Sequence, residues 1–151
     1  MAVKKRCLLC QGDCKNAFCQ GALPPEEVTI VRPPLGDPEA EPNEYWLLLQ
    51  TLYGLCHSPR HWYKKITNIF LSISLTPSLE DPCLFTGFVQ DPNYPNIHVS
   101  NHPLSLGLYV DNFVYFLEDP NLEDLFCNLL SKCCKVDFMV IVEWFLGVHF
   151  S

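Results

Sequence analysis

The stretch from Leu104 to Glu118, LSLGLYVDNFVYFLE, constrains the fold of this chain more than any other. Up to Val110, apolar residues alternate with polar or small ones, which is typical of a strand that buries one face. Asp111 and Asn112 follow as a two-residue turn, because Asp and Asn tolerate the positive φ that such a turn requires. A second strand is expected from Phe113 to Leu117. The stretch therefore predicts an antiparallel hairpin with an acidic tip.

The carboxylate of Asp111 allows two interpretations. It closes the first strand on its non-apolar face, beside Tyr109, where it could meet a metal ion or a phosphate. An acidic hairpin tip is also explained as a simple solvated turn. A partner carboxylate at another strand end favours the first interpretation, and Asp13 supplies one, because it directly follows a short strand expected over residues 1–12.

The remaining pattern predicts two main helices and several short strands. The first helix is capped by Ser58 and opens with Pro59, and apolar residues recur at helical spacing from Trp62 to Ile73. The second helix is capped by Asp119, with Pro120 at its first position. Further strands are expected at residues 28–31, at 45–49 as a buried strand, at 81–89, and as a strand pair within 136–150. Helices spaced between antiparallel strands indicate an α+β fold of the split βαβ, ferredoxin-like type.

The charge balance limits what the chain can bind unaided. It holds 17 Asp and Glu against 10 Lys and Arg, for a formal net charge of -7. Nucleic-acid affinity comes largely from Lys and Arg that neutralise phosphates, so a nucleic-acid role requires local basic patches or additional segments. The first helix carries one basic stripe, which is either solvated surface or the best phosphate-facing patch of the chain. The polar stripe contains Arg60, Lys64 and Asn68, and the phosphate-facing patch would consist of Arg60, His61, Lys64 and Lys65.

The nine cysteines indicate a reduced protein with free thiols, because their number is odd and no signal peptide is evident. An intracellular location is therefore expected, and no membrane partner, since no apolar run is long enough to span a bilayer. Cys7, Cys10, Cys14 and Cys19 raise the possibility of zinc, but their spacing lacks two separated knuckles and a nearby His. Small buried thiols are the alternative explanation.

Four motifs, in this order, resemble the reverse transcriptase of copia-type long-terminal-repeat retrotransposons. They are QGDCKNAFCQG at residues 11–21, LYGLCHSPRHWY at 52–63, YVDN at 109–112 and FLGVHF at 145–150. The resemblance implies a reverse-transcriptase palm that carries out RNA-directed DNA synthesis by nucleotidyl transfer. Two carboxylates that are remote in sequence and meet at strand ends suit a two-metal site of this kind.

The resemblance also implies a role for individual residues. Asp13 and Asp111 would bind two Mg²⁺ ions, and Asn112 stands where the family has a further carboxylate, which lowers the charge of the site. The backbone carbonyl of Cys14 would be another ligand, and the ring of Phe18 would block a ribose 2′-hydroxyl. Positions implied to face the nucleotide or template are Tyr53, Gly54, Ser58, Pro59, Arg60 and Tyr109. The primer grip would contain Phe145, Leu146 and Gly147.

The resemblance covers nearly the whole chain, so we expect residues 1–151 to form a single partial domain, a palm without the preceding fingers segment, the thumb or ribonuclease H. Its partners would be an RNA or DNA template-primer, deoxynucleotides, and the missing polymerase segments or other retroelement domains. Three functions stay open: an active polymerase piece, a degenerate palm with little activity, or a thiol-rich metal-binding or interaction module. We favour the degenerate palm because of Asn112 and the missing segments.

Overall fold

The computed structural model describes residues 8–96, 100–139, 142 and 144–149. Within these ranges one antiparallel sheet has six strands, in the order β4-β5-β6-β7-β1-β8. Two smaller sheets have two strands each, and the helices are α2, α3 and the short 3₁₀ helix η1. The strands of the main sheet are β1 (Leu8–Cys14), β4 (Thr76–Pro77), β5 (Leu84–Gly87), β6 (Leu104–Tyr109), β7 (Asn112–Leu117) and β8 (Val136–Met139). The other elements are η1 (Ala17–Gln20), β2 (Ile30–Val31), β3 (Trp46–Leu47), α2 (Ser58–Ser72), α3 (Asn121–Cys133), β9 (Trp144–Phe145) and β10 (Val148–His149).

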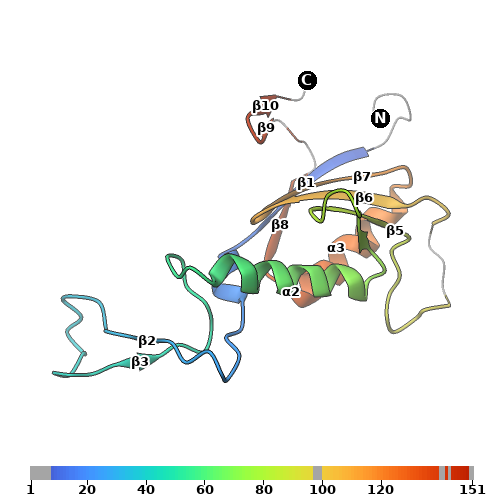
Figure 1. Cartoon of the computed structure of the whole chain (residues 1–151). Coiled ribbons are helices and arrows are strands. Elements are labelled where there is room, and N and C mark those ends of the chain that lie inside the picture. The colour runs from blue at the N-terminus through green and yellow to red at the C-terminus, as the bar shows by residue number, and fades with distance from the viewer. Residues whose placement is uncertain (1–7, 97–99, 140–141, 143, 150–151) are drawn as a thin grey trace.

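Both long helices cover one face of the main sheet, and the β9–β10 hairpin lies on the opposite side (Figure 1). The β2–β3 ribbon extends away from the sheet, beyond η1. The predicted mixed α/β chain with two main helices and an antiparallel sheet is confirmed. Neither long helix in the described ranges is of a length and hydrophobicity that would let it cross a lipid bilayer.

The core lies between the helices and the sheet, and Phe113 on β7 is at its centre. Its buried ring lies within 6.4 Å, between centroids, of the rings of Phe70 on α2 and Phe126 on α3. The helices bury one face each, as their apolar spacing predicts. The buried residues on these faces are Trp62, Ile66, Ile69 and Phe70 on α2, and Leu122, Phe126, Leu129 and Leu130 on α3.

The central hairpin has its turn one residue earlier than predicted. Tyr109 pairs with Asn112, so Val110 and Asp111 are the turn residues. Val110 adopts a φ of 57°, which is uncommon for a β-branched residue. Alternation had placed Val110 in the strand, since the local pattern carries no information about contacts from other elements.

Other predictions about local structure were wrong at element ends. β1 does not stop at residue 12 but runs to Cys14, because it pairs with strands on both sides there. Ser58 does not cap α2: it lies inside the helix, and its hydroxyl donates a hydrogen bond to the Leu52 carbonyl. α3 begins at Asn121, one residue after the predicted first position, but the Asp119 carboxylate accepts the backbone N–H of Asn121 over 3.0 Å, as the predicted capping residue should. The start of the strand predicted from residue 1 lies outside the described residues.

The segment 45–49 was predicted to be a buried strand, and this was wrong. Only Trp46 and Leu47 are in a strand, and their side chains are 40% and 58% exposed. They pair with β2 in a separate ribbon and not with the main sheet. A short apolar run does not reveal whether a sheet exists to cover it.

Gly12 is required by the packing of Phe113. A Cβ at this position would lie 2.1 Å from the nearest ring carbon of Phe113. We predict that Gly12→Ala lowers the free energy of unfolding by about 1–3 kcal/mol, because the overpacked ring must move. Urea denaturation measures the loss. Gly107→Ala is the matched control, since its Cβ would meet side-chain atoms only at 3.6 Å or beyond and its effect should stay within about 1 kcal/mol. Equal losses in the two variants would contradict this account.

Candidate functional site

Asp13 lies in a row of residues that crosses four strands of the main sheet. β1 pairs with β7 on one side and β8 on the other, so Asp13 faces Asn112 and Asp137 in register. Tyr109 on β6 continues the row beyond Asn112. Directly opposed residues of antiparallel strands project to the same face. Their neighbours Gly12 and Phe113 are buried toward the helices, so this row projects from the face opposite the helices.

The turn that carries Asp111 is fixed from two sides. The backbone N–H of Cys14 donates to the Asp111 carbonyl over 2.8 Å. The indole N–H of Trp62, from the buried face of α2, donates to the Val110 carbonyl over 2.6 Å. These two contacts explain how a β-branched residue is held at a positive φ, a conformation that costs on the order of 1–3 kcal/mol. The surrounding structure therefore sets the position of Asp111 relative to Asp13.

The carboxylates repel one another electrostatically. Burial raises the pKa of Asp13, and the negative charges of Asp111 and then Asp137 raise it further. The ammonium group of Lys15 acts in the opposite direction and forms an ion pair with Asp137 at 2.7 Å. The Asn112 amide lies 3.5 Å from an Asp111 carboxylate oxygen. A cation bound between Asp13 and Asp111 would relieve this repulsion.

Two aromatic rings that the resemblance assigns to the site pack against each other. The rings of Phe18 on η1 and Tyr53 are 4.8 Å apart, tilted by 48°. Burial raises the pKa of Tyr53, and so does the negative charge of Asp111. The hydroxyl of Thr51 donates to the Phe18 carbonyl and joins the two segments. Phe18 and Tyr53 therefore form one aromatic pair, and the charge of Asp111 acts on its Tyr53 member.

The other residues to which the resemblance gives a role either lie in other parts of the fold or determine the local backbone conformation. Ser58 and Pro59 begin α2, with Ser58 bonded to a loop carbonyl, and Arg60 is exposed and lines a cavity along that helix. Gly54 has a φ of 95°, which favours glycine, and an open position with no atom near an added Cβ. Phe145 is in β9, and Leu146 and Gly147 form the turn to β10, in a hairpin separate from the main sheet.

Two residues that contribute to the candidate site were not predicted from the sequence. Trp62 was assigned only to the apolar face of α2, although its indole also holds the turn before Asp111. Asp137 was not predicted as a site residue, because it lies in a segment that departs from the motifs of the resemblance. Its place beside Asp13 follows from topology: the strand after the second helix of a split βαβ unit can pair with the first strand.

The donor set available for Mg²⁺ consists of the Asp13 and Asp111 carboxylates and the Asn112 amide oxygen. Mg²⁺ prefers such oxygen ligands and is usually held by one or two carboxylates together with substrate phosphates, so the residues present fit the ion. Across the ranges that the structure describes, no group of three or more His, Cys, Asp or Glu side chains could hold a metal ion alone. This also applies to Cys10, Cys14 and Cys19, whereas Cys7 lies outside those ranges.

Comparison with known proteins identifies the class. Over residues 1–151 the chain matches the family described as "Reverse transcriptase (RNA-dependent DNA polymerase)", and it belongs to that family. The prediction of a reverse transcriptase of the copia type is thereby confirmed.

Three plant relatives illustrate the relationship. The chain is 33% identical over 149 residues to the retrovirus-related Pol polyprotein from transposon RE2 of Arabidopsis thaliana, and 29% identical over 149 residues to that from transposon RE1; each match covers 99% of the chain. It is 29% identical over 138 residues, 91% of the chain, to the Pol polyprotein from transposon TNT 1-94 of Nicotiana tabacum. The matches span 10%, 9% and 10% of these relatives. No solved structure matches the chain significantly.

Removing the charge of Asp111 should lower the pKa of Asp13. We predict a downward shift in Asp111→Asn, because a carboxylate that raises the Asp13 pKa is lost while the Asn side chain keeps a similar size. The pH dependence of the Asp13 carboxyl ¹³C chemical shift measures the pKa. Asp124→Asn, on the exposed surface of α3, is the control and should leave it unchanged. An unchanged value in Asp111→Asn would show that the carboxylates do not interact.

Proposed function

We propose that this chain is the palm of an RNA-directed DNA polymerase and that its site serves two-metal nucleotidyl transfer. The observation that carries the proposal is the register of β1 against β7, which brings Asp13 beside the turn of Asp111 and Asn112. The order β1, α2, β6, β7, α3, β8 along the chain, with β6-β7-β1-β8 across the sheet, supports a split βαβ, ferredoxin-like palm. Family membership supports the same activity.

In this proposal different residues of the site bind the metal ions and select the sugar of the nucleotide. Asp13 and Asp111, with the Cys14 carbonyl, would hold Mg²⁺. When bound, the ions activate the primer 3′-hydroxyl and neutralise charge on the transferred phosphoryl group and the leaving pyrophosphate. The ring of Phe18, which packs against Tyr53, would exclude a ribose 2′-hydroxyl. These contacts would favour deoxynucleotides.

We further propose that the activity of these 151 residues alone is low. Asn112 supplies an amide where a carboxylate would strengthen cation binding. The chain spans about a tenth of the plant relatives, and we propose that holding a template-primer requires further polymerase segments or other retroelement domains. The unpaired state of the eight described cysteines is compatible with a reducing, intracellular setting.

Binding of Mn²⁺ tests the metal site directly. Asn112→Asp adds one negative charge close to the ion, which is worth on the order of 1–2 kcal/mol in water, so Mn²⁺ should bind roughly tenfold tighter. Asp13→Asn should weaken it by a similar factor. Electron paramagnetic resonance measures free Mn²⁺ in a titration, and Asp124→Asn is the control. Equal affinities in the unmodified chain and Asp13→Asn would refute the assignment of this site.

Primer extension tests whether the chain polymerises unaided. With Mg²⁺, primer-template and deoxynucleotides, we expect the unmodified chain to give no extension above that of Asp13→Asn. Asn112→Asp alone should not restore extension, because it does not supply a grip on the template-primer. Robust extension by the unmodified chain, abolished in Asp13→Asn, would support the polymerase chemistry but contradict the low activity.

A further inference from the structure

Two cysteine side chains from distant parts of the chain meet on the helix-covered side of the main sheet. Cys14 ends β1, and Cys134 directly follows α3. Cys14 faces Val136 in the register of β1 with β8. The Lys15 N–H extends this ladder by donating to the Lys135 carbonyl over 3.0 Å. Cys134 is thus the diagonal neighbour of Cys14 across the two chains, and both side chains belong to the buried core.

The two thiols contact each other. The Cys14 side chain donates a hydrogen bond to the Cys134 sulfur, and the Cys134 thiol donates in turn to the Leu130 carbonyl over 3.5 Å. Both cysteines are free, and 1% and 7% of their surfaces are exposed. The polymerase function proposed above uses only the backbone carbonyl of Cys14. Two adjacent nucleophilic sulfurs therefore have no part in that function.

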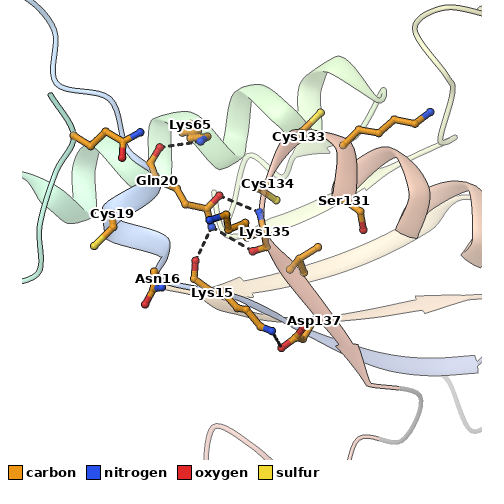
Figure 2. A pocket seen from close by; sticks show the side chains of 13 residues that line it. Lys15, Asn16, Cys19, Gln20, Lys65, Ser131, Cys133, Cys134, Lys135 and Asp137 are labelled. Atoms are coloured by element: carbon orange, nitrogen blue, oxygen red, sulfur yellow. Dashed lines mark hydrogen bonds and ion pairs between the residues drawn. The ribbon is translucent and has the colours of Figure 1, made fainter.

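A cavity of about 770 Å³ gives access to one of the two sulfurs. It lies where β1 leads into η1 and where α3 leads into β8 (Figure 2). Cys134 and its neighbour Cys133 line this cavity, whereas Cys14 does not. A small molecule that enters the cavity therefore reaches Cys134 before Cys14.

The cavity is rich in positive charge. Four lysines line it, namely Lys15, Lys65, Lys132 and Lys135, together with the single carboxylate of Asp137. That carboxylate forms an ion pair with Lys15 at 2.7 Å. When a sulfur attacks a peroxide, one oxygen departs with negative charge, which fixed positive charges stabilise. The lining of the cavity therefore favours reaction of a thiol there with a peroxide.

We propose that a hydroperoxide oxidises Cys134 and Cys14 to an intramolecular disulfide. In the first step the Cys134 sulfur attacks the peroxide: an S–O bond forms, the O–O bond breaks, and the thiol proton leaves with the departing oxygen as water or an alcohol. Cys134 is then a sulfenic acid. In the second step the Cys14 sulfur attacks it: the S–S bond forms, the S–O bond breaks, and water is released. Two thiols are oxidised, one peroxide is reduced, and exchange with a small thiol reverses the reaction.

The disulfide links the end of β1 to the end of α3, next to the candidate site. Cys14 directly follows Asp13, and its backbone N–H donates to the Asp111 carbonyl over 2.8 Å. Oxidation therefore acts on the backbone that sets the position of both carboxylates. The inference concerns the thiols alone and does not depend on metal binding or catalysis by those carboxylates.

Oxidation of the full chain with hydrogen peroxide tests the proposal. The buffer contains a chelator, so that trace metals do not decompose the peroxide and the proposed metal site does not affect the result. Remaining thiols are blocked with N-ethylmaleimide in urea, the chain is digested without reductant, and linked peptides are identified by mass spectrometry. We expect the peptide that joins Cys14 to Cys134 to be the main cross-link and dithiothreitol to remove it. Unfolding in urea before oxidation should distribute the cross-links over other cysteines.

Three variants separate the two steps. Cys14→Ser keeps a small hydrogen-bond donor but removes the second thiol, so Cys134 should stop at the sulfenic acid, which dimedone labels. Cys134→Ser should leave Cys14 reduced. Cys133→Ser is the matched control, because Cys133 is exposed and lines the same cavity. It should change the rate of Cys14–Cys134 cross-linking by less than about twofold.

The cross-links of the unmodified chain decide the outcome even if a variant fails to fold. The proposal is overturned if Cys14 and Cys134 stay reduced in the folded chain while the exposed Cys133 is oxidised. It is equally overturned if either sulfur pairs mainly with another cysteine, or if Cys133→Ser abolishes the cross-link.

Discussion

The pairing of β1 with β7 is the constraint on which the rest of the site depends. The side chains of a strand alternate between faces, so a shift of one residue would turn Asp13 toward the helices and separate it from Asn112. Gly12 and Phe113, which are paired in the same ladder, oppose such a shift, since only a residue without a side chain fits against the Phe113 ring. The packing of the core and the position of the carboxylates are thus set by one register.

Much of the fold follows from local pattern, and most of the errors have tertiary causes. The spacing of Trp62 and Ile66 predicted α2, and alternation predicted the central hairpin. The turn was placed one residue late, because its position depends on contacts from Cys14 and Trp62 that are remote in sequence. The ribbon at 45–49 was predicted to be buried because an apolar run reveals hydrophobicity but not what covers it.

The arrangement of charges was predicted least completely, because it also depends on which remote segments folding brings together. A net charge of -7 suggested poor binding of nucleic acid, but net charge does not say how charges are arranged. The structure separates an acidic row containing Asp13 and Asp137 from six Lys and Arg side chains that line two cavities. Lys15 belongs to both regions, because it pairs with Asp137 and also lines one of these cavities. Asp13 and Asp111 were visible as candidates because motifs mark them, whereas Lys132 and Lys135 lie outside every motif.

The hydrogen bond from the Cys14 N–H to the Asp111 carbonyl is the most direct report on whether the two acidic segments meet as described. Nuclear magnetic resonance can detect a scalar coupling across such a bond, between the amide ¹⁵N of Cys14 and the carbonyl ¹³C of Asp111. We predict that this coupling is observed and that the Cys14 amide exchanges slowly with solvent. No coupling, together with exchange as fast as in an unfolded chain, would contradict the account.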